Sequence, residues 1–125
     1  MKKILIVDDN QDNRELIRKI LKNSSCQIFE ATDGQAAIER AVQLEPDLIL
    51  MDMQLPVLSG YQAVARIRET PGLRRTPIIG LTSYAMVGDR EKVLACGCNE
   101  YMAKPIDISA FRGLLKAYLE KDGAG

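Results

Sequence analysis

Polar residues follow directly on four apolar runs of the sequence, and their types could do chemistry together. The runs and the residues after them are these: Asp8 and Asp9 after residues 4–7, Asp52 after residues 48–51, Thr82 after residues 78–81, and Lys104 after residues 101–103. A charge at the end of a buried segment is costly unless something pairs with it. If the four run ends meet, they assemble three carboxylates, one hydroxyl and one ammonium.

The three carboxylates indicate a metal site. Carboxylates held close together repel one another and raise each other's pKa unless a cation joins them. A site made only of oxygen ligands suits Mg²⁺, a hard octahedral ion, with Mn²⁺ as the alternative. We therefore predict a divalent-cation site at Asp8, Asp9 and Asp52.

A metal ion and a lysine beside one carboxylate suit the transfer of a phosphoryl group. The two cations would neutralise charge on the phosphoryl oxygens in transit. A carboxylate can itself act as the nucleophile, which gives an aspartyl phosphate. The sequence has no histidine, so Ser-His-Asp catalysis and a Cys/His zinc site are excluded. A phosphoryl group carried by this chain must sit on another residue type.

Each of these residues taken alone also has a purely structural explanation. Asp8 and Asp9 could favour a helix dipole, Asp52 could cap a loop, Thr82 could be a turn hydroxyl, and Lys104 could be a solvated lysine. Their joint occurrence at the ends of four apolar runs is what favours the functional interpretation.

The elements that must bring these residues together form an alternating pattern. Five apolar runs alternate with stretches of helical periodicity, and the runs are continuously apolar. This pattern is typical of an α/β fold in which a doubly wound, five-stranded parallel sheet carries helices on both faces. Ligands of such sheets bind outside the carboxyl ends of the strands, where the polar residues would converge.

Local signals predict the ends of several elements. Asp33 is a predicted N-cap, Ser59 opens a capping box with Gln62, and Gly97 is a predicted helix end. The run at residues 27–31 is shorter and more polar than the others, which predicts an edge strand. The last helix has the clearest apolar stripe: Ile108, Phe111, Leu114, Leu115, Tyr118 and Leu119.

Length and composition are typical of one globular domain. The chain has 125 residues, of which 46% are hydrophobic and 27% charged. Lys plus Arg and Asp plus Glu number 17 each, and this zero net charge argues against non-specific binding to nucleic acid or to an anionic membrane. Neither a membrane-spanning run nor a signal-peptide pattern occurs, so we expect a cytoplasmic protein. We expect residues 1–121 to form the domain and residues 122–125 a flexible tail.

These motifs make the sequence similar to a known family. Asp8-Asp9, Asp52, Thr82 and Lys104-Pro105 closely resemble the signature of the response-regulator receiver domain of two-component signalling, over residues 2 to about 120. The stretches LILMDMQLP and GLTSYAMVGDREK look most like stand-alone single-domain receivers and receivers of hybrid sensor kinases. The resemblance implies a flavodoxin-like fold of five βα units with strand order 2-1-3-4-5.

The resemblance also implies a role for each signature residue. Asp52 is the expected phosphoacceptor, and Thr82 and Lys104 are expected to contact the phosphoryl group. The expected ligands of Mg²⁺ (or Mn²⁺) are Asp9, Asp8 largely through water, Asp52, and the backbone carbonyl of Gln54. The bond between Lys104 and Pro105 is expected to be cis, a form that is rare outside X-Pro bonds.

A receiver of this kind acts as a signalling switch. It takes its phosphoryl group from a sensor histidine kinase or a histidine phosphotransfer protein. Thr82 and Tyr101 are then expected to move. Their movement would remodel the face made by the fourth helix, fifth strand and fifth helix. Without an output domain, the chain would act as a monomer or weak dimer on a protein target. We expect no enzyme activity beyond self-phosphorylation from a donor and slow autodephosphorylation. Gln54 and Tyr84 flank the site and are expected to tune hydrolysis.

Three other functions are less compatible with the residues. A Mg²⁺-dependent phosphatase with an Asp nucleophile needs a second acid two positions on, where this chain has Gln54. A flavin-binding electron carrier would need a phosphate-binding loop after the first strand, where Asp8 and Asp9 would repel the flavin phosphate. A degenerate receiver that only scaffolds would lack signature residues, and here all of them are present.

Overall fold

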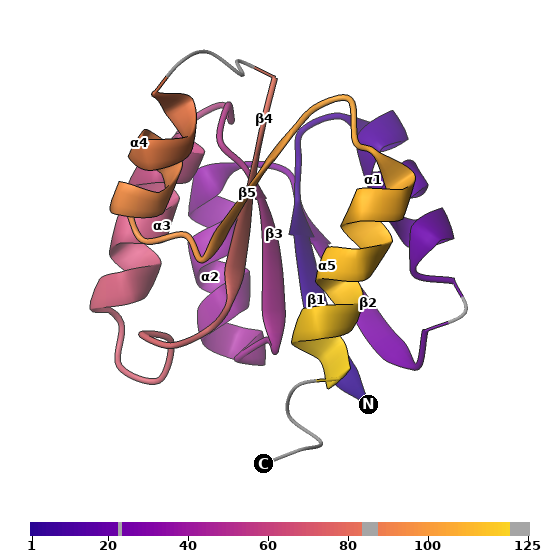
Figure 1. Ribbon diagram of the computed structural model, residues 1–125. Helices are drawn as coiled ribbons and strands as arrows, with labels where there is room; N and C mark the ends of the chain where they lie inside the picture. Colours follow the sequence, from indigo (N-terminus) through magenta and orange to yellow (C-terminus); the bar gives the residue numbers. More distant parts are fainter. Residues whose placement is uncertain (23, 84–87, 121–125) are drawn as a thin grey trace.

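A parallel sheet of five strands forms the centre of the molecule. The computed structural model describes residues 1–22, 24–83 and 88–120. The strands are β1 (Lys2–Val7), β2 (Cys26–Ala31), β3 (Leu48–Asp52), β4 (Ile78–Thr82) and β5 (Glu100–Ala103). Their order is β2-β1-β3-β4-β5, and each neighbouring pair is parallel (Figure 1). The predicted fold and strand order are confirmed, and β2 is an edge strand, as its polarity indicated.

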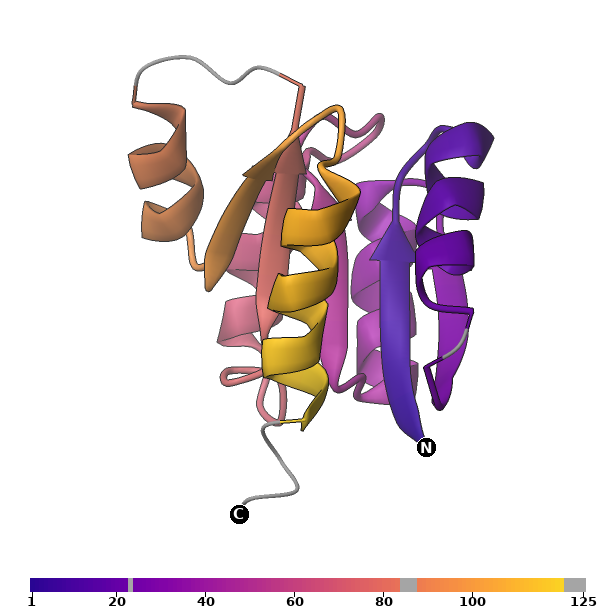
Figure 2. The same cartoon turned by 45° about the vertical axis from the view of Figure 1, so that its right-hand side comes forward.

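Helices cover both faces of this sheet. They are α1 (Gln11–Ile20), α2 (Gly34–Leu44), α3 (Gly60–Glu69), α4 (Asp89–Ala95) and α5 (Ile108–Glu120). Figures 1 and 2 show α1 and α5 on one face, with α2, α3 and α4 on the other. Each of the first four helices follows one strand and returns the chain to the amino end of the sheet, where the next strand begins.

Alternate residues of β1 serve two separate hydrophobic clusters. Ile4 and Ile6 pack in the cluster that includes Phe111 of α5. Leu5 and Val7 pack in the opposite cluster, with residues of α2 and α3. All four strand residues are fully buried. Successive side chains of a strand point to opposite faces, so burial on both faces explains the continuous apolar run.

The register of the strands brings their polar ends side by side. Asp8 directly follows β1, Asp52 and Thr82 are the last residues of β3 and β4, and Lys104 directly follows β5. Val7 pairs with Met51, so Asp8 and Asp52 are the next residues along two neighbouring strands. The polar groups therefore gather at the carboxyl edge of the sheet, where the sequence predicted the site.

Helix ends follow the local signals in the sequence. The Asp33 carboxylate accepts a hydrogen bond from the N–H of Ala36 at the start of α2. Ser59 and Gln62 form the predicted capping box of α3. Helix α4 is the shortest, with seven residues, and its N-cap residue, Gly88, has no side chain with which to cap it.

One residue of the predicted apolar stripe of α5 is exposed. The stripe residues that pack against the sheet are Phe111, Leu114, Leu115, Tyr118 and Leu119. Ile108 is instead 43% exposed. Residues 107–110 are all exposed, so the first turn of α5 stands clear of the sheet, and Ile106 packs against the cluster just before the helix begins.

Candidate functional site

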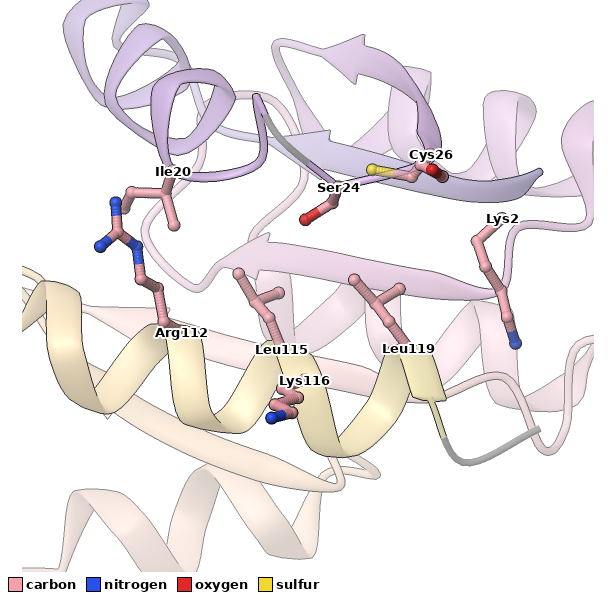
Figure 3. Close-up of a pocket in the computed structure, with 9 residues that line it drawn as sticks. Lys2, Ile20, Ser24, Cys26, Arg112, Leu115, Lys116 and Leu119 are labelled. Atoms are coloured by element: carbon pink, nitrogen blue, oxygen red, sulfur yellow. The ribbon is translucent and has the colours of Figure 1, made fainter. Parts of the chain in front are cut away.

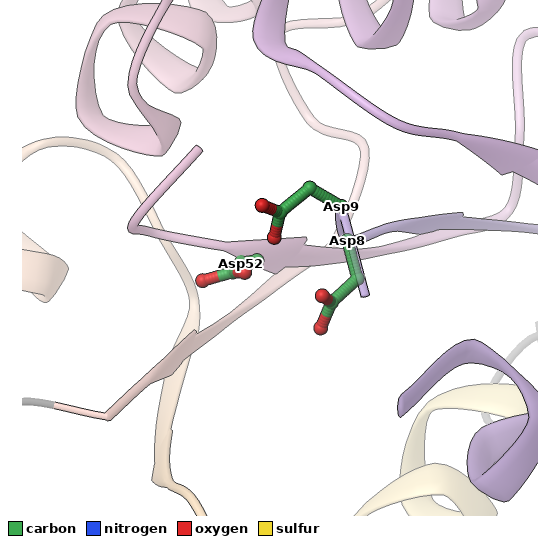
Figure 4. Close-up of side chains that lie close together, drawn as sticks. All are labelled: Asp8, Asp9 and Asp52. Atoms are coloured by element: carbon green, nitrogen blue, oxygen red, sulfur yellow. The ribbon is translucent and has the colours of Figure 1, made fainter. Parts of the chain in front are cut away.

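Three carboxylates converge at the carboxyl edge of the sheet. Asp8, Asp9 and Asp52 each offer an oxygen atom, and these oxygens all lie within 4.8 Å of one another (Figure 4). Asp8 is 0% and Asp52 3% exposed, whereas Asp9 is open to solvent. The structure thus brings together all three predicted metal-site carboxylates, two of them buried.

Lys104 pairs with both buried carboxylates. Its ammonium Nζ lies 2.9 Å from Asp8 Oδ2 and 3.2 Å from Asp52 Oδ2. The Lys104 side chain is only 12% exposed, so these contacts are largely shielded from water. The peptide bond between Lys104 and Pro105 is cis. The residue expected to contact a phosphoryl group therefore already touches the expected phosphoacceptor.

The charge balance of this cluster favours a divalent cation. Burial, followed by the charge of Asp8, raises the pKa of Asp52, although the Gln54 N–H and Lys104 oppose the rise. Burial alone would lower the pKa of Lys104, but its hydrogen bond to Asp8 and the charge of Asp52 raise it. Three carboxylates and one ammonium leave two negative charges in excess. An all-oxygen donor set with this charge fits Mg²⁺.

Gln54, two residues after Asp52, makes three hydrogen bonds at the site. Its backbone N–H donates to Asp52 Oδ1 at 2.9 Å. Its side-chain Nε2 donates to Thr82 Oγ1 at 2.8 Å, and its Oε1 accepts from the Ser83 N–H at 3.0 Å. The sequence predicted a ligand role for the Gln54 carbonyl, which stays a prediction, but it did not reveal this side-chain bridge to β4.

The two residues of the predicted switch occupy different surroundings. Thr82, at the mouth of the site, is 1% exposed. Tyr101 is half-buried and packs against the hydrophobic cluster that lies between the sheet and helices α2, α3 and α4. Their coupled movement stays a prediction. Tyr84, expected to flank the site, lies outside the described residues, as do residue 121 at the end of the expected domain and residues 122–125 of the expected tail.

An ion-pair network holds the turn that carries Asp8 and Asp9. The Asp8 N–H donates to Ala31 O at 3.1 Å, and Arg14 Nη1 donates to Asp8 O at 2.8 Å. The Arg14 Nε also donates to Glu30 Oε1 at 2.7 Å, while Arg18 pairs with the other Glu30 oxygen. Sequence reasoning missed this network; its one signal was a pair of arginines a helical turn apart.

A separate hollow lies at the other end of the sheet. It has a volume of about 580 Å³ and lies between α1, the start of β2 and α5 (Figure 3). Leu115 and Leu119 line it together with Lys2 and Cys26, the first residues of β1 and β2. The amino ends of the strands border this hollow, so it takes no part in the acidic site at their carboxyl ends.

Comparison with known proteins identifies the family. The family model of the response regulator receiver domain matches residues 4–116. The chain belongs to this receiver-domain family. The receiver is also 37% identical over 118 residues to the polar-differentiation response regulator DivK of Brucella anthropi, a match that covers 94% of this chain and 96% of DivK. The resemblance drawn from the sequence motifs is thereby confirmed.

Solved structures of similar proteins include two further receivers. The receiver domain of the sensor histidine kinase PA1611 from Pseudomonas aeruginosa, whose structure holds a magnesium ion in the active-site cleft, is 39% identical with a TM-score of 0.85. That match covers 94% of this receiver and 97% of the PA1611 chain. The chemotaxis response regulator CheY4 of Vibrio cholerae is 26% identical, with a TM-score of 0.86 over 94% of this receiver and 98% of CheY4.

Within residues 1–22, 24–83 and 88–120, no helix is long and apolar enough to cross a bilayer.

Proposed function

We propose that this receiver accepts a phosphoryl group on Asp52 from a sensor histidine kinase or a histidine phosphotransfer protein. The observation that carries this proposal is the contact between Lys104 and Asp52, 3.2 Å long and beside two further carboxylates. A buried carboxylate with a cation already in place is suited to act as a nucleophile toward an anionic group. Membership of the receiver family supports the same conclusion.

In the proposed transfer, an Asp52 oxygen attacks the phosphorus of the donor. The bond from phosphorus to oxygen forms as the bond from phosphorus to the donor's histidine nitrogen breaks, and the nitrogen keeps the electron pair. Lys104 remains beside the transferred oxygens and offsets their charge. Later attack of water on phosphorus returns the Asp52 carboxylate and releases inorganic phosphate, which accounts for slow autodephosphorylation.

We propose Mg²⁺ as the cation of this site, with Mn²⁺ able to replace it. Asp9, Asp52 and the Gln54 carbonyl would hold it directly, and Asp8 largely through water. When bound, the ion neutralises negative charge on the phosphoryl oxygens during transfer. The excess of two negative charges in the cluster supports this assignment, as does the magnesium ion held by the related PA1611 receiver.

The signal would pass to a protein partner through the face of α4, β5 and α5. Thr82 would turn toward the phosphoryl group and Tyr101 would move inward, which shifts the balance between two existing packings. Helix α4 is short, and its N-cap residue, Gly88, makes no side-chain cap hydrogen bond, so repacking of the helix breaks no such bond. We expect the receiver to act as a monomer or weak dimer and without binding nucleic acid.

Mass spectrometry after incubation with acetyl phosphate tests the proposal. We expect a gain of one phosphoryl group that requires Mg²⁺ and is lost in Asp52→Asn. Asp12→Asn, a change at an exposed aspartate of α1, is the matched control and should still be phosphorylated. The proposal fails if Asp52→Asn is phosphorylated like the wild type. It also fails if neither acetyl phosphate nor a phosphorylated histidine phosphotransfer protein modifies the wild type.

A further inference from the structure

The side chain of Gln54 spans the mouth of the site from the loop after β3 to the end of β4. It holds Thr82 through a hydrogen bond of 2.8 Å and the Ser83 N–H through one of 3.0 Å. The orientation of the amide follows from chemistry, because a backbone N–H can only donate. Gln54 Oε1 must therefore face Ser83, and the amide nitrogen must face the Thr82 hydroxyl.

The two groups held by Gln54 are the ones that would form hydrogen bonds to a phosphoryl group on Asp52. Asp52 Oδ1 already accepts from the Gln54 backbone N–H, and Asp52 Oδ2 faces Lys104. A phosphoryl group brings three acceptor oxygens and strong negative charge, so it seeks further donors beside Lys104. The Ser83 N–H donates to the Gln54 side chain, and the Thr82 hydroxyl accepts from it, so Gln54 occupies the Ser83 donor and fixes the position of the Thr82 hydroxyl.

We propose that Gln54 is a positioning residue whose side-chain amide is a latch: it holds Thr82 and Ser83 in the unphosphorylated arrangement and must release them when Asp52 is phosphorylated. This inference rests on the proposed function. Hydrogen bonds to a charged phosphoryl oxygen are roughly twice as strong as those between neutral groups. The phosphoryl group therefore displaces the amide, and the latch raises the threshold for switching without blocking it.

The test uses beryllofluoride, a phosphoryl mimic that binds carboxylates, together with Mg²⁺. Gln54→Met keeps an unbranched side chain of similar length and removes both side-chain hydrogen bonds. We expect Gln54→Met to bind beryllofluoride more tightly than the wild type, by about fivefold for each hydrogen bond that no longer has to break. Gln43→Met, at an exposed position of α2, is the matched control and should leave the affinity unchanged.

A spectroscopic measurement separates the latch from a general effect on folding. In the free wild type, the Ser83 amide proton should exchange slowly with water, and in Gln54→Met it should exchange faster. In the wild type itself, the Gln54 side-chain amide protons should exchange faster once beryllofluoride binds. This second comparison requires no variant, so it remains decisive if Gln54→Met folds poorly.

The outcomes distinguish the latch from the proposed function. If the wild type binds beryllofluoride but Gln54→Met binds it equally or more weakly, the latch is wrong and the proposed function stands. Unchanged exchange of the Gln54 amide protons on binding also overturns the latch alone. If the wild type binds no beryllofluoride and accepts no phosphoryl group from either donor, the proposed function falls and the latch falls with it.

Discussion

Ionisation of the Asp52 carboxylate lowers the stability of the fold. Burial and the neighbouring Asp8 raise its pKa above the ordinary value of 3.8, although Lys104 and the Gln54 N–H oppose the rise. A raised pKa in the folded state means that the ionised form is less favourable there than in the unfolded chain. This destabilising contribution has its full size at pH values above the folded-state pKa of Asp52. It disappears below pH 3.8, where the carboxyl group is protonated in both the folded and the unfolded state.

Asp52→Asn should therefore stabilise the protein in the absence of divalent cations. We expect a gain on the order of 1 kcal/mol in the free energy of unfolding at pH 7, because the amide removes a buried charge while Lys104 keeps Asp8 as a partner. Urea denaturation at pH 7 and below pH 3.8 measures the effect. The gain should vanish at the lower pH; a gain that persists there would come from packing rather than charge.

Glu30 shows the opposite dependence on pH. Burial alone would raise its pKa, but hydrogen bonds and charges from Arg18 and Arg14 outweigh burial and lower it below 4.5. A lowered pKa stabilises the fold above the ordinary value, and that contribution is lost as the pH falls through the folded-state pKa. The network also holds the carbonyl of Asp8, so it supports the turn that carries the metal-site carboxylates.

Glu30→Gln should destabilise the protein by on the order of 1 kcal/mol at pH 7, since partly exposed ion pairs are screened by solvent. The difference from the wild type should shrink once the pH falls below 4.5. Thermal unfolding monitored by circular dichroism across this range measures it. Gln27→Glu, at an exposed position of β2, is a control for charge on that strand. Its difference in stability from the wild type should not depend on pH in the way expected for Glu30→Gln.

Among the elements, α3 is tied to two loops by a single side chain. The Arg68 guanidinium donates to the carbonyls of residues 73, 74, 76 and 97 and to Asn99 Oδ1, at 2.7 to 3.2 Å. Asn99 Oδ1 also accepts from the Ile78 N–H at the start of β4. Arg68 thus links the end of α3, the start of β4 and the loop between α4 and β5.

Arg68→Lys should destabilise the fold because an ammonium cannot reproduce the planar fork of donors. We expect a loss of roughly 2–4 kcal/mol, since several carbonyls lose a charge-assisted hydrogen bond. Arg66→Lys, at an exposed position of the same helix, should change the stability little. Urea denaturation of the two variants makes the comparison. Equal losses of stability in the two variants would show that the loss does not come from the planar donors of the Arg68 guanidinium.

The packing of α4 on β4 depends on a glycine. A Cβ atom at Gly80 would lie 2.6 Å from Val93 Cγ1 and 3.2 Å from Cys98 Sγ. Contacts this short force neighbouring atoms to move. The distance between α4 and the sheet is therefore set by the absence of a side chain at Gly80.

Gly80→Ala should cost roughly 1–3 kcal/mol by overpacking this contact. Val93→Ala makes room for the added methyl group, so the double variant should lose less stability than the sum of the two single variants. Denaturation of the three proteins gives this coupling. Strict additivity would mean that Gly80 and Val93 do not limit the approach of α4.

For the molecule as a whole, the acidic edge links folding to the metal ion. The cluster has two excess negative charges, and the folded chain alone brings its three carboxylates within 4.8 Å. A cation that binds only the folded state stabilises it, by about 2.7 kcal/mol at a concentration one hundred times the Kd.

We expect Mg²⁺ to raise the melting temperature, and a chelator to reverse the change. Differential scanning calorimetry at matched ionic strength measures it. Asp9→Asn changes an exposed residue that we propose as a ligand, and it should reduce the shift without greatly altering the melting temperature of the metal-free protein. An undiminished shift in Asp9→Asn would show that Mg²⁺ stabilises the protein at another place.

The amino-acid sequence was sufficient to predict the order of the elements, the parallel sheet and which residues stand at the strand ends. These features are local: a continuous apolar run predicts a strand buried on both faces, and a run that ends in Asp52 or Thr82 delivers a polar group at its carboxyl end. The caps at Asp33 and Ser59 were predictable for the same reason, since a cap and its helix are adjacent in the chain.

The contacts among these groups, in contrast, depend on the tertiary structure. Lys104 lies 96 positions from Asp8, and the Gln54 amide reaches Thr82 across 28. Such contacts depend on which strands are neighbours, on their register and on side-chain conformation, and no local pattern encodes these. The same holds for the clamp of Arg14 on the Asp8 carbonyl and for the five acceptors of Arg68. The local order of residues predicts that the charged groups lie at one edge of the sheet. The attraction and repulsion among these groups arise only in the folded sheet, because folding brings them within a few ångströms of one another.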